Sequence, residues 1–489
     1  MIAVLYALAM AVLLVYGLNL LWLVLGYARH DRLRPGPVPA ADAVPAPDAS
    51  WPAVTVQLPL YNEALVAARL LDACAALDYP RHLLEIQVLD DSTDETTAIV
   101  ARRVARWKAR GVPFVHVRRA HREGYKAGAL AAGLRLAKGS LIAIFDADFV
   151  PPPDFLRRVV PCFDDPAVGM AQARWEHLNA AAGFLTRVQA LGLDAHFAVE
   201  QRVRSRLGCF MNFNGTAGLW RRTCIEAAGG WQGDTLTEDL DLSYRAQLAG
   251  WTFRYVPDVE VPAELPADMG ALRTQQFRWA KGAVETSRKL LRPLWQSRQP
   301  RRVKLEGTLH LTAHVVFPFV LLAALLHAPL LLQAHRGHGP GPLYFAVMAL
   351  GLAGFAGFCL AHLFAQRDLY PDWGRRLRYL PVFIAGTMGL SLSNTQAVWQ
   401  ALRGRRSAFV RTPKLSGRPA AWAHRYAATR LPAVAYLEAL LFVYCLAGLG
   451  VVVGLGDWAA VPFQALFACG FGLVGAANLQ QLRRRTRHA

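Results

Sequence analysis

The sequence predicts an α/β domain with a mostly parallel sheet, joined to a multi-span helical membrane domain. Between residues 54 and 173, short runs of β-branched residues alternate with longer helical patterns, which is typical of right-handed βαβ units. Outside that region, apolar runs of about 20 residues occur near the start of the chain and in its last third, long enough to cross a bilayer.

The composition is too apolar for an ordinary soluble protein. Hydrophobic residues make up 54% of the 489 residues and charged residues only 18%, whereas soluble domains contain about 25% charged residues. The net charge of +19 could indicate nucleic acid binding, but the sequence has no zinc-finger spacing and no basic zipper. Much of the arginine instead flanks apolar segments, as the positive-inside rule expects, so we expect no nucleic acid partner.

The first apolar run, Ile2 to Leu25, lacks a basic start and a small-residue cleavage pattern. We therefore expect a retained membrane anchor over residues 1–28 and not a removed signal. A basic segment then opens a Pro/Ala-rich juxtamembrane linker over residues 29–52. This positive flank predicts that the following domain, residues 53–287, is cytoplasmic, in an integral protein of a bacterial-type inner membrane.

A second membrane block is expected over residues 305–489. Its expected spans lie at about residues 306–333, 342–366, 432–455 and 458–480. The segment 379–400 is long enough to cross, but arginines lie on both sides, so a re-entrant hairpin or a span that breaks the rule are both possible interpretations. Asn394 within it indicates contact with protein or a polar path. Residues 288–304 have the mixed basic and apolar character of an interfacial helix.

Two acidic motifs follow strands of the predicted sheet. The expected strands are residues 54–58, 85–89, 115–117 and 141–145. Asp90-Asp91-Ser92-Thr93-Asp94 comes directly after the second strand, and Asp146-Ala147-Asp148 after the fourth. Ligands of such sheets bind beyond the carboxyl ends of the strands, so both motifs fall at the expected ligand edge.

Each of these motifs has a functional and a purely structural interpretation. Asp146 and Asp148 could hold a Mg²⁺ or Mn²⁺ ion that also binds a diphosphate, or they could be merely solvated. Asp90 or Asp91 could contact the base or ribose of a nucleotide while the rest of the run caps a helix, and capping alone is the alternative. Lys126 lies in a glycine-bearing loop that leads into a helix, which suits a cation near phosphate, although a solvated surface charge is also possible.

Two later motifs carry groups suited to sugar chemistry. In Thr237-Glu238-Asp239, Asp239 is a candidate base, because a sugar hydroxyl is a poor nucleophile until its proton is removed. Favourable charge at a helix N-terminus is the alternative. In Gln275-Gln276-Phe277-Arg278-Trp279, Arg278 offers a cationic fork for a diphosphate and Trp279 a face for a sugar ring, or a core side chain. The small residues from Asn212 to Gly218 form either a turn or a loop whose backbone approaches an acceptor.

Together and in this order, the four motifs resemble the family 2 glycosyltransferases, and most closely the cellulose synthase superfamily, over roughly residues 54 to 290. The longer strings look most similar to the cellulose synthase-like A group, the plant mannan and glucomannan synthases. Those strings are Gln87 to Asp94, Phe145 to Phe149, Gln172 to Trp175 and Phe213 to Gly218.

The resemblance implies a GT-A nucleotide-sugar fold and a role for each motif. It implies donor binding by Asp90 or Asp91, Lys126, Asp146 and Arg278, metal binding by Asp146 and Asp148, catalysis by Asp239, and acceptor binding by Asn214, Gly215, Gln275 and Trp279. Transfer would be one in-line displacement with inversion, giving a β-linked product from an α-linked donor. The donor would be GDP-mannose by the nearer resemblance or UDP-glucose by the wider one, and the partners a glycan acceptor and the lipid bilayer.

A fainter resemblance and two competing functions complete the expectations. Phe409 to Lys414 is similar to the gating loop of bacterial cellulose synthases, with Arg411 where that family has Val. The chain ends soon after Arg485, so we expect no cyclic-dinucleotide receptor module. Our leading hypothesis is a polymerising enzyme that exports a β-glycan through its own helices. The alternatives are a single-addition transferase acting on a lipid, as ceramide glucosyltransferases do, and a transporter with a large cytosolic domain.

Overall fold

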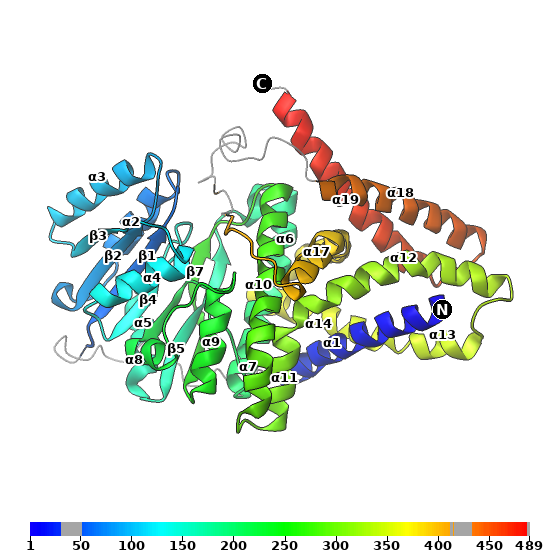
Figure 1. The fold of residues 1–489 in the computed structure, drawn as a ribbon, viewed down its shortest axis with the longest axis horizontal. Coiled ribbons are helices and arrows are strands. Elements are labelled where there is room, and N and C mark those ends of the chain that lie inside the picture. Colours follow the sequence, from blue (N-terminus) through cyan, green and yellow to red (C-terminus); the bar gives the residue numbers. More distant parts are fainter. Residues whose placement is uncertain (31–50, 411–413, 415–432, 487–489) are drawn as a thin grey trace.

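In the computed structural model, the described residues are 1–30, 51–410, 414 and 433–486, so the expected linker lies mostly outside them. A seven-stranded sheet forms the centre of the soluble domain, and the long apolar helices extend from one side of it (Figure 1). The strand order is β3-β2-β1-β4-β6-β5-β7. The strands are β1 (Val54–Leu60), β2 (Leu84–Asp90), β3 (Phe114–Arg118), β4 (Leu141–Ile144), β5 (Val168–His177), β6 (Gly218–Arg221) and β7 (Thr252–Ala263).

The sheet is mostly parallel, as the sequence predicts. Strands β1 to β4 pair in parallel, and β5 pairs in parallel with β7, while β6 runs antiparallel between β4 and β5. Because side chains alternate along a strand, β4 buries Leu141 and Ala143 in one core and Ile142 and Ile144 in the other. Burial on both faces explains why its sequence is continuously apolar.

Helices cover both faces of the sheet. The core on one face contains residues of α2, α3 and α5, and the core on the other contains residues of α4, α8 and α9. The bounds are α2 (Ala67–Ala75), α3 (Thr96–Lys108), α4 (Tyr125–Leu136), α5 (Phe155–Val159), α8 (Arg222–Ala227) and α9 (Glu238–Leu248). Short 3₁₀ turns lie at Arg81–Leu83, Val160–Asp164, Ala180–Ala182, Ala313–Val315 and Leu377–Tyr379.

Between β5 and β6 the chain forms one long helical stretch with a change of pitch in its middle. It consists of α6 (Phe184–Ala195), a π-helical segment (His196–Gln201) and α7 (Arg202–Arg206). Its buried residues Ala195, Val199 and Val203 pack against Leu23 and Tyr27 of the N-terminal helix α1 (Ile2–His30). The stretch therefore links the sheet domain to the membrane anchor.

Two helices join the sheet domain to the second membrane block. α10 (Met269–Gln296) is continuous through the expected boundary at residues 287 and 288, and α11 (Arg301–Leu311) follows Pro300. Residues 288–304 are thus the end of α10, a break and the start of α11, and not one interfacial helix. Pro300 explains the break, because proline disfavours the helical conformation in the residue before it.

Five described helices are long and apolar enough to cross a membrane by length and composition, at Ile2–Arg29, Ala313–His335, Pro342–Leu369, Ala433–Gly454 and Val461–Gln480. They fall in α1, α12 (Val316–His335), α13 (Pro342–Met348) with α14 (Gly351–Leu369), α18 (Ala433–Gly454) and α19 (Val461–Thr486). The span expected to start at residue 306 starts at Ala313 instead. Residues 306–311 belong instead to the separate helix α11, in which the buried Glu306 carboxylate accepts a 2.6 Å hydrogen bond from Arg204 Nε of the sheet domain.

The segment 379–400 forms two short helices. α16 (Leu380–Gly389) and α17 (Ser391–Leu402) are separated at Leu390, and a small helix, α15 (Trp373–Arg376), precedes them. α16 packs against α19, where a Cβ on Gly389 would lie 2.2 Å from the Gly470 carbonyl oxygen. α17 packs along α10, and its Asn394 is buried. This segment is not among the five candidate spans.

Candidate active site

A single cleft brings the four sequence motifs together. Asp91 follows β2 and Asp148 follows β4, while Asp239 lies in the first turn of α9 and Arg278 lies on α10. Its lining includes nearly every residue singled out from the sequence: Asp91, Lys126, Asp146, Asp148, Asn214, Gly215, Asp239, Gln275, Arg278 and Trp279. Residues separated by almost 190 positions in the chain therefore share one site at the carboxyl edge of the sheet.

The adjacent pair Asp90 and Asp91 divides into two roles. Asp90 is 1% exposed, its carboxylate accepts a 2.9 Å hydrogen bond from the Ser92 amide, and it lies 3.0 Å from His116 Nε2. Burial raises the pKa of Asp90, but the hydrogen bonds from His116 and Ser92 outweigh burial and hold it below its ordinary value. Asp90 therefore shapes the turn, and Asp91 lines the cleft, paired with the Arg119 guanidinium. Asp90, singled out with Asp91 as a candidate for donor binding, is not among the residues that line the cleft.

Lys126 lies at the centre of the cleft, in the first turn of α4. Gly124 (φ +68°) adopts the left-handed conformation at the start of that helix, as the glycine-bearing loop predicts. The ammonium lies 2.6 Å from Asp146 Oδ1 and donates a 2.8 Å hydrogen bond to the Gly215 carbonyl. Burial works to lower the pKa of Lys126, but Asp146 and Glu238 outweigh it and the pKa is raised, so the group stays charged.

Asp239 lines the cleft, and its environment raises its pKa. Burial first, and then the neighbouring Glu238 carboxylate, raise the pKa of Asp239 to about 7, against the lowering influence of Lys126 and Arg278. Gly215 makes room for it, because a Cβ at that position would lie 2.8 Å from Asp239 Oδ2. A carboxyl group that titrates near neutral pH is matched to accepting a proton from a hydroxyl.

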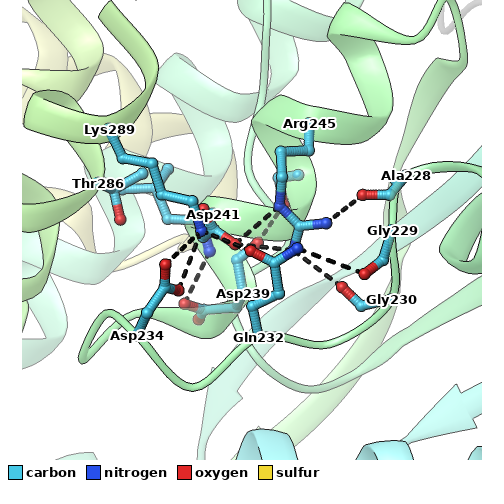
Figure 2. A network of polar contacts seen from close by, with 12 residues as sticks. Ala228, Gly229, Gly230, Gln232, Asp234, Asp239, Asp241, Arg245, Thr286 and Lys289 are labelled. Carbon is cyan, nitrogen blue, oxygen red and sulfur yellow. Dashed lines mark hydrogen bonds and ion pairs between the residues drawn. The ribbon is translucent and has the colours of Figure 1, made fainter.

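A network of polar contacts next to Asp239 fixes the start of α9 (Figure 2). Asp241 is fully buried, with Oδ2 2.7 Å from Arg245 Nη2 and Oδ1 2.9 Å from Lys289 Nζ of α10. Lys289 also reaches Asp234 at 2.8 Å, and Arg245 donates a 2.9 Å hydrogen bond to the Gly230 carbonyl. α9, the loop before it and α10 are thereby tied together, which sets Asp239 relative to Arg278 and Trp279.

The two carboxylates of the Asp-x-Asp motif face cations of the protein itself. Asp146 Oδ1 faces Lys126, as described above, and Asp148 Oδ2 lies 2.6 Å from Lys414 Nζ. Phe409, in the same segment as Lys414, also reaches the cleft, where its ring centroid lies 4.5 Å from the Arg278 guanidinium. Residues 411–413, in the middle of the gating-loop resemblance, lie outside the described part of the chain. Within the described part, no group of three or more acidic, His or Cys side chains could hold a metal. Two carboxylates nevertheless fit Mg²⁺ or Mn²⁺, because such ions take the rest of their ligands from phosphate and water.

Several cleft residues were not singled out from the sequence. Tyr61 and Glu63 come directly after β1, so the strand-end rule that found Asp91 could have found them too. Arg122 lies 3.4 Å from the centroid of the Tyr61 ring, next to Asp91. Trp175 belongs to a motif string without an assigned role. No local signal in the sequence placed Lys414 at Asp148, since they are far apart in the chain.

The fold and the cleft define a class of protein: a membrane-embedded glycosyltransferase with a GT-A catalytic domain. Its marks are an Asp-x-Asp pair and a further carboxylate, Asp239, in one cleft at the carboxyl edge of a mostly parallel sheet, and apolar helices of membrane-spanning length. The chain belongs to the family 2 glycosyltransferases. The family described as "Glycosyltransferase like family 2" matches residues 52–282.

Curated relatives support this assignment, and one solved structure shares the fold. The chain is 36% identical to glucomannan 4-beta-mannosyltransferase 1 of Oryza sativa subsp. japonica, over 78% of this chain and 70% of that protein. It is 44% identical to glucomannan 4-beta-mannosyltransferase 7 of Arabidopsis thaliana, over 51% of this chain and 46% of that protein. The mannosyltransferase of Pyrobaculum calidifontis, solved with GDP-Man and Mn²⁺, has a TM-score of 0.56 and 22% identity, covering 83% of this chain and 100% of that one. This last likeness shows the fold alone.

Proposed function

We propose that the protein is an inverting, metal-dependent mannosyltransferase that extends a β-1,4-linked mannan or glucomannan with mannose from GDP-mannose. The observation that carries the proposal is Asp239, whose pKa of about 7 suits a base and which shares one cleft with the Asp-x-Asp pair. The relatives named as glucomannan mannosyltransferases favour mannose as the sugar and a glycan as the acceptor. The second candidate is UDP-glucose as the donor with a glucan-like product, and the test below compares the two donors.

In the proposed reaction, the acceptor hydroxyl oxygen forms a bond to the anomeric carbon of mannose while the bond from that carbon to the diphosphate oxygen breaks. The hydroxyl proton passes to Asp239, and GDP leaves with the electron pair of the broken bond. Attack from the face opposite the diphosphate inverts an α-linked donor to a β-linked product. A divalent cation held by Asp146 and Asp148 would neutralise the charge that develops on the diphosphate.

The remaining cleft residues have matching places in this proposal. Asp91, with Arg122 and Tyr61 beside it, would contact the nucleoside end of the donor. Lys126 and Arg278 supply positive charge toward the diphosphate, and burial of these cations strengthens their effect because water screens them less. Gln275 and Trp279 on α10, with Asn214 and Gly215 beside the base, would bind the acceptor.

We also propose that successive additions occur at the cytoplasmic face and that the product leaves through the apolar helices. The proximity of the catalytic helix α10 to α17, which carries the buried Asn394, supports a connection between cleft and membrane block. The plant origin of the relatives gives no support to a bacterial inner membrane, so the proposal specifies only a cell membrane with the catalytic domain on its cytoplasmic side.

The test is to incubate purified protein in lipid vesicles with labelled GDP-mannose or UDP-glucose and Mg²⁺ or Mn²⁺. We expect an insoluble product from GDP-mannose that β-mannanase degrades, and loss of synthesis when the metal is chelated. Label that partitions into organic solvent would instead identify a lipid acceptor and overturn the proposal. A product that only a glucanase degrades would overturn the choice of donor.

A further inference from the structure

The side-chain amide of Asn214, on the wall of the cleft, is held from two sides by the π-helical segment. Gln201 Nε2 donates a 2.7 Å hydrogen bond to Asn214 Oδ1, and Asn214 Nδ2 lies 3.0 Å from His196 Nε2. The Asn214 backbone amide donates a further 2.9 Å hydrogen bond to Gln172 Oε1. Both the backbone and the side chain of this residue are therefore fixed.

The orientation of each group follows from one backbone carbonyl. Gln201 Nε2 also donates a 2.7 Å hydrogen bond to the Asn212 carbonyl oxygen. Because a carbonyl only accepts, the Gln201 atom between Asn212 and Asn214 must be the amide nitrogen, and Asn214 must face it with Oδ1. Asn214 Nδ2 then faces His196, so His196 Nε2 must accept through its lone pair and carry its proton on Nδ1.

The surroundings of His196 agree with this tautomer. Its Nδ1 faces Glu200 Oε2 at 3.8 Å, and Glu200 in turn lies 2.9 Å from Arg204 Nη2. Burial raises the pKa of Glu200, but Arg204 outweighs burial and holds that pKa well below its ordinary value, so the group that faces Nδ1 is a carboxylate, whose negative charge favours a proton on Nδ1. Arg204 is anchored to Glu306 of α11, which connects this cluster to the first helix after the catalytic domain.

The change of helical pitch explains how two residues of one helix reach the same amide. In an α-helix of 3.6 residues per turn, positions five apart, such as His196 and Gln201, point about 140° apart. A π-turn links residues five apart, which brings both side chains to one side. π-turns of this kind are rare and are frequently found at functional sites.

We propose that His196 and Gln201 are positioning residues that fix the Asn214 amide so that the second Nδ2 hydrogen is presented to a hydroxyl oxygen of the glycan acceptor. Asn214 precedes Gly215, which lies against the base Asp239, so a donor at this point faces the sugar that loses its proton. This inference rests on the proposed function and deepens it by naming the groups that orient the acceptor.

The experiment compares His196→Asn with His196→Gln in the full chain in lipid vesicles, with GDP-mannose and mannan oligosaccharides. Asparagine places an amide near the position of Nδ1 and is too short to reach Asn214, whereas glutamine can place an accepting oxygen near the position of Nε2. We expect the KM for the oligosaccharide to rise about three- to tenfold in His196→Asn, as for one lost hydrogen bond, and His196→Gln to rescue it. The KM for GDP-mannose and its hydrolysis by water should stay at wild-type values in both.

Two more variants keep the test decisive if His196→Asn does not fold. Gln201→Met removes the hydrogen bond from Gln201 to Asn214 Oδ1 while keeping nearly the same side-chain volume. It should raise the KM for the oligosaccharide by a similar factor. Asn214→Ala should do the same, and adding His196→Asn to it should cause no further change, because His196 acts only through Asn214. An unchanged acceptor KM in the single variants, an equal rise in the KM for GDP-mannose, or additive effects in the double variant would overturn the inference. No mannosyl transfer by the wild-type protein would overturn the proposed function itself.

Discussion

Replacing Gly215 with alanine probes the space next to the proposed base. The backbone at Gly215 has φ +83°, a left-handed conformation that costs an L-residue about 1–2 kcal/mol. The added Cβ would lie 2.8 Å from Asp239 Oδ2 and 3.3 Å from Lys126 Nζ. Since ordinary carbon–oxygen contacts begin near 3.4 Å, the carboxylate must retreat by about 0.6 Å.

A displacement of this size at a reacting group reduces the rate far more than the stability. We expect kcat for mannosyl transfer to fall about 10- to 100-fold, because a misplacement of about 1 Å can cost about 100-fold. The free energy of unfolding should fall only by the left-handed strain of about 1–2 kcal/mol. The assay is label transfer from saturating GDP-mannose, with thermal unfolding measured in the same detergent.

Gly111→Ala is the matched control. Gly111 has φ +74°, is exposed after α3, and has nothing within 4 Å of its added Cβ. It should lose similar stability while keeping wild-type kcat. If Gly215→Ala kept wild-type kcat despite folding, the contact between residue 215 and Asp239 could not be what positions the base, and the reasoning would be refuted.

Further predictions follow from the same cleft and from the buried ion pairs. Asp239→Asn should lower kcat about 10²- to 10⁴-fold, since an amide cannot accept the proton, and should leave thermal unfolding unchanged. Transfer at the wild-type rate by this variant would exclude Asp239 as the base. Because the base must be ionised and the pKa of Asp239 is raised to about 7, kcat should fall as pH drops below about 7. Glu238→Gln removes a like charge that raises this pKa, so a pH–rate profile should show the acid limb at lower pH, and an unmoved limb would contradict the assignment. Asp146→Asn and Asp148→Asn should each raise the Mn²⁺ concentration that gives half-maximal transfer, and an unchanged titration would argue against a metal at these carboxylates. Arg204→Met leaves the buried Glu306 without its partner and should destabilise the fold by about 3–5 kcal/mol in denaturant unfolding. Arg254→Met breaks an exposed pair with Asp165 and should change stability by about 0.5 kcal/mol at most.

The sequence located the sheet strands and the four motifs because each is a local signal. The run Leu141 to Ile144 is apolar at every position, which indicates burial on both faces before any partner strand is known. A strand end followed by Asp146 and Asp148 places those carboxylates at the ligand edge by the geometry of parallel sheets alone. The same local reasoning left open which of Asp90 and Asp91 faces the ligand. The structure places Asp91 on the cleft wall and buries Asp90 against His116, a contact that joins two different strands.

The order of apolar and acidic segments along this chain by itself determined a membrane protein with an α/β domain and a ligand edge, because hydropathy and strand ends are properties of neighbouring residues, and the resemblance of the four motifs implied the nucleotide sugar. Only the tertiary structure decided what long-range packing controls. It placed Glu306 in the separate helix α11, paired with Arg204, so that the second candidate span begins at Ala313, and it raised the pKa of Asp239 through burial and Glu238. It also set the Asn214 amide against His196 and Gln201, since the desolvation and hydrogen bonding of a side chain depend on groups that the folded chain alone brings within a few ångströms of it.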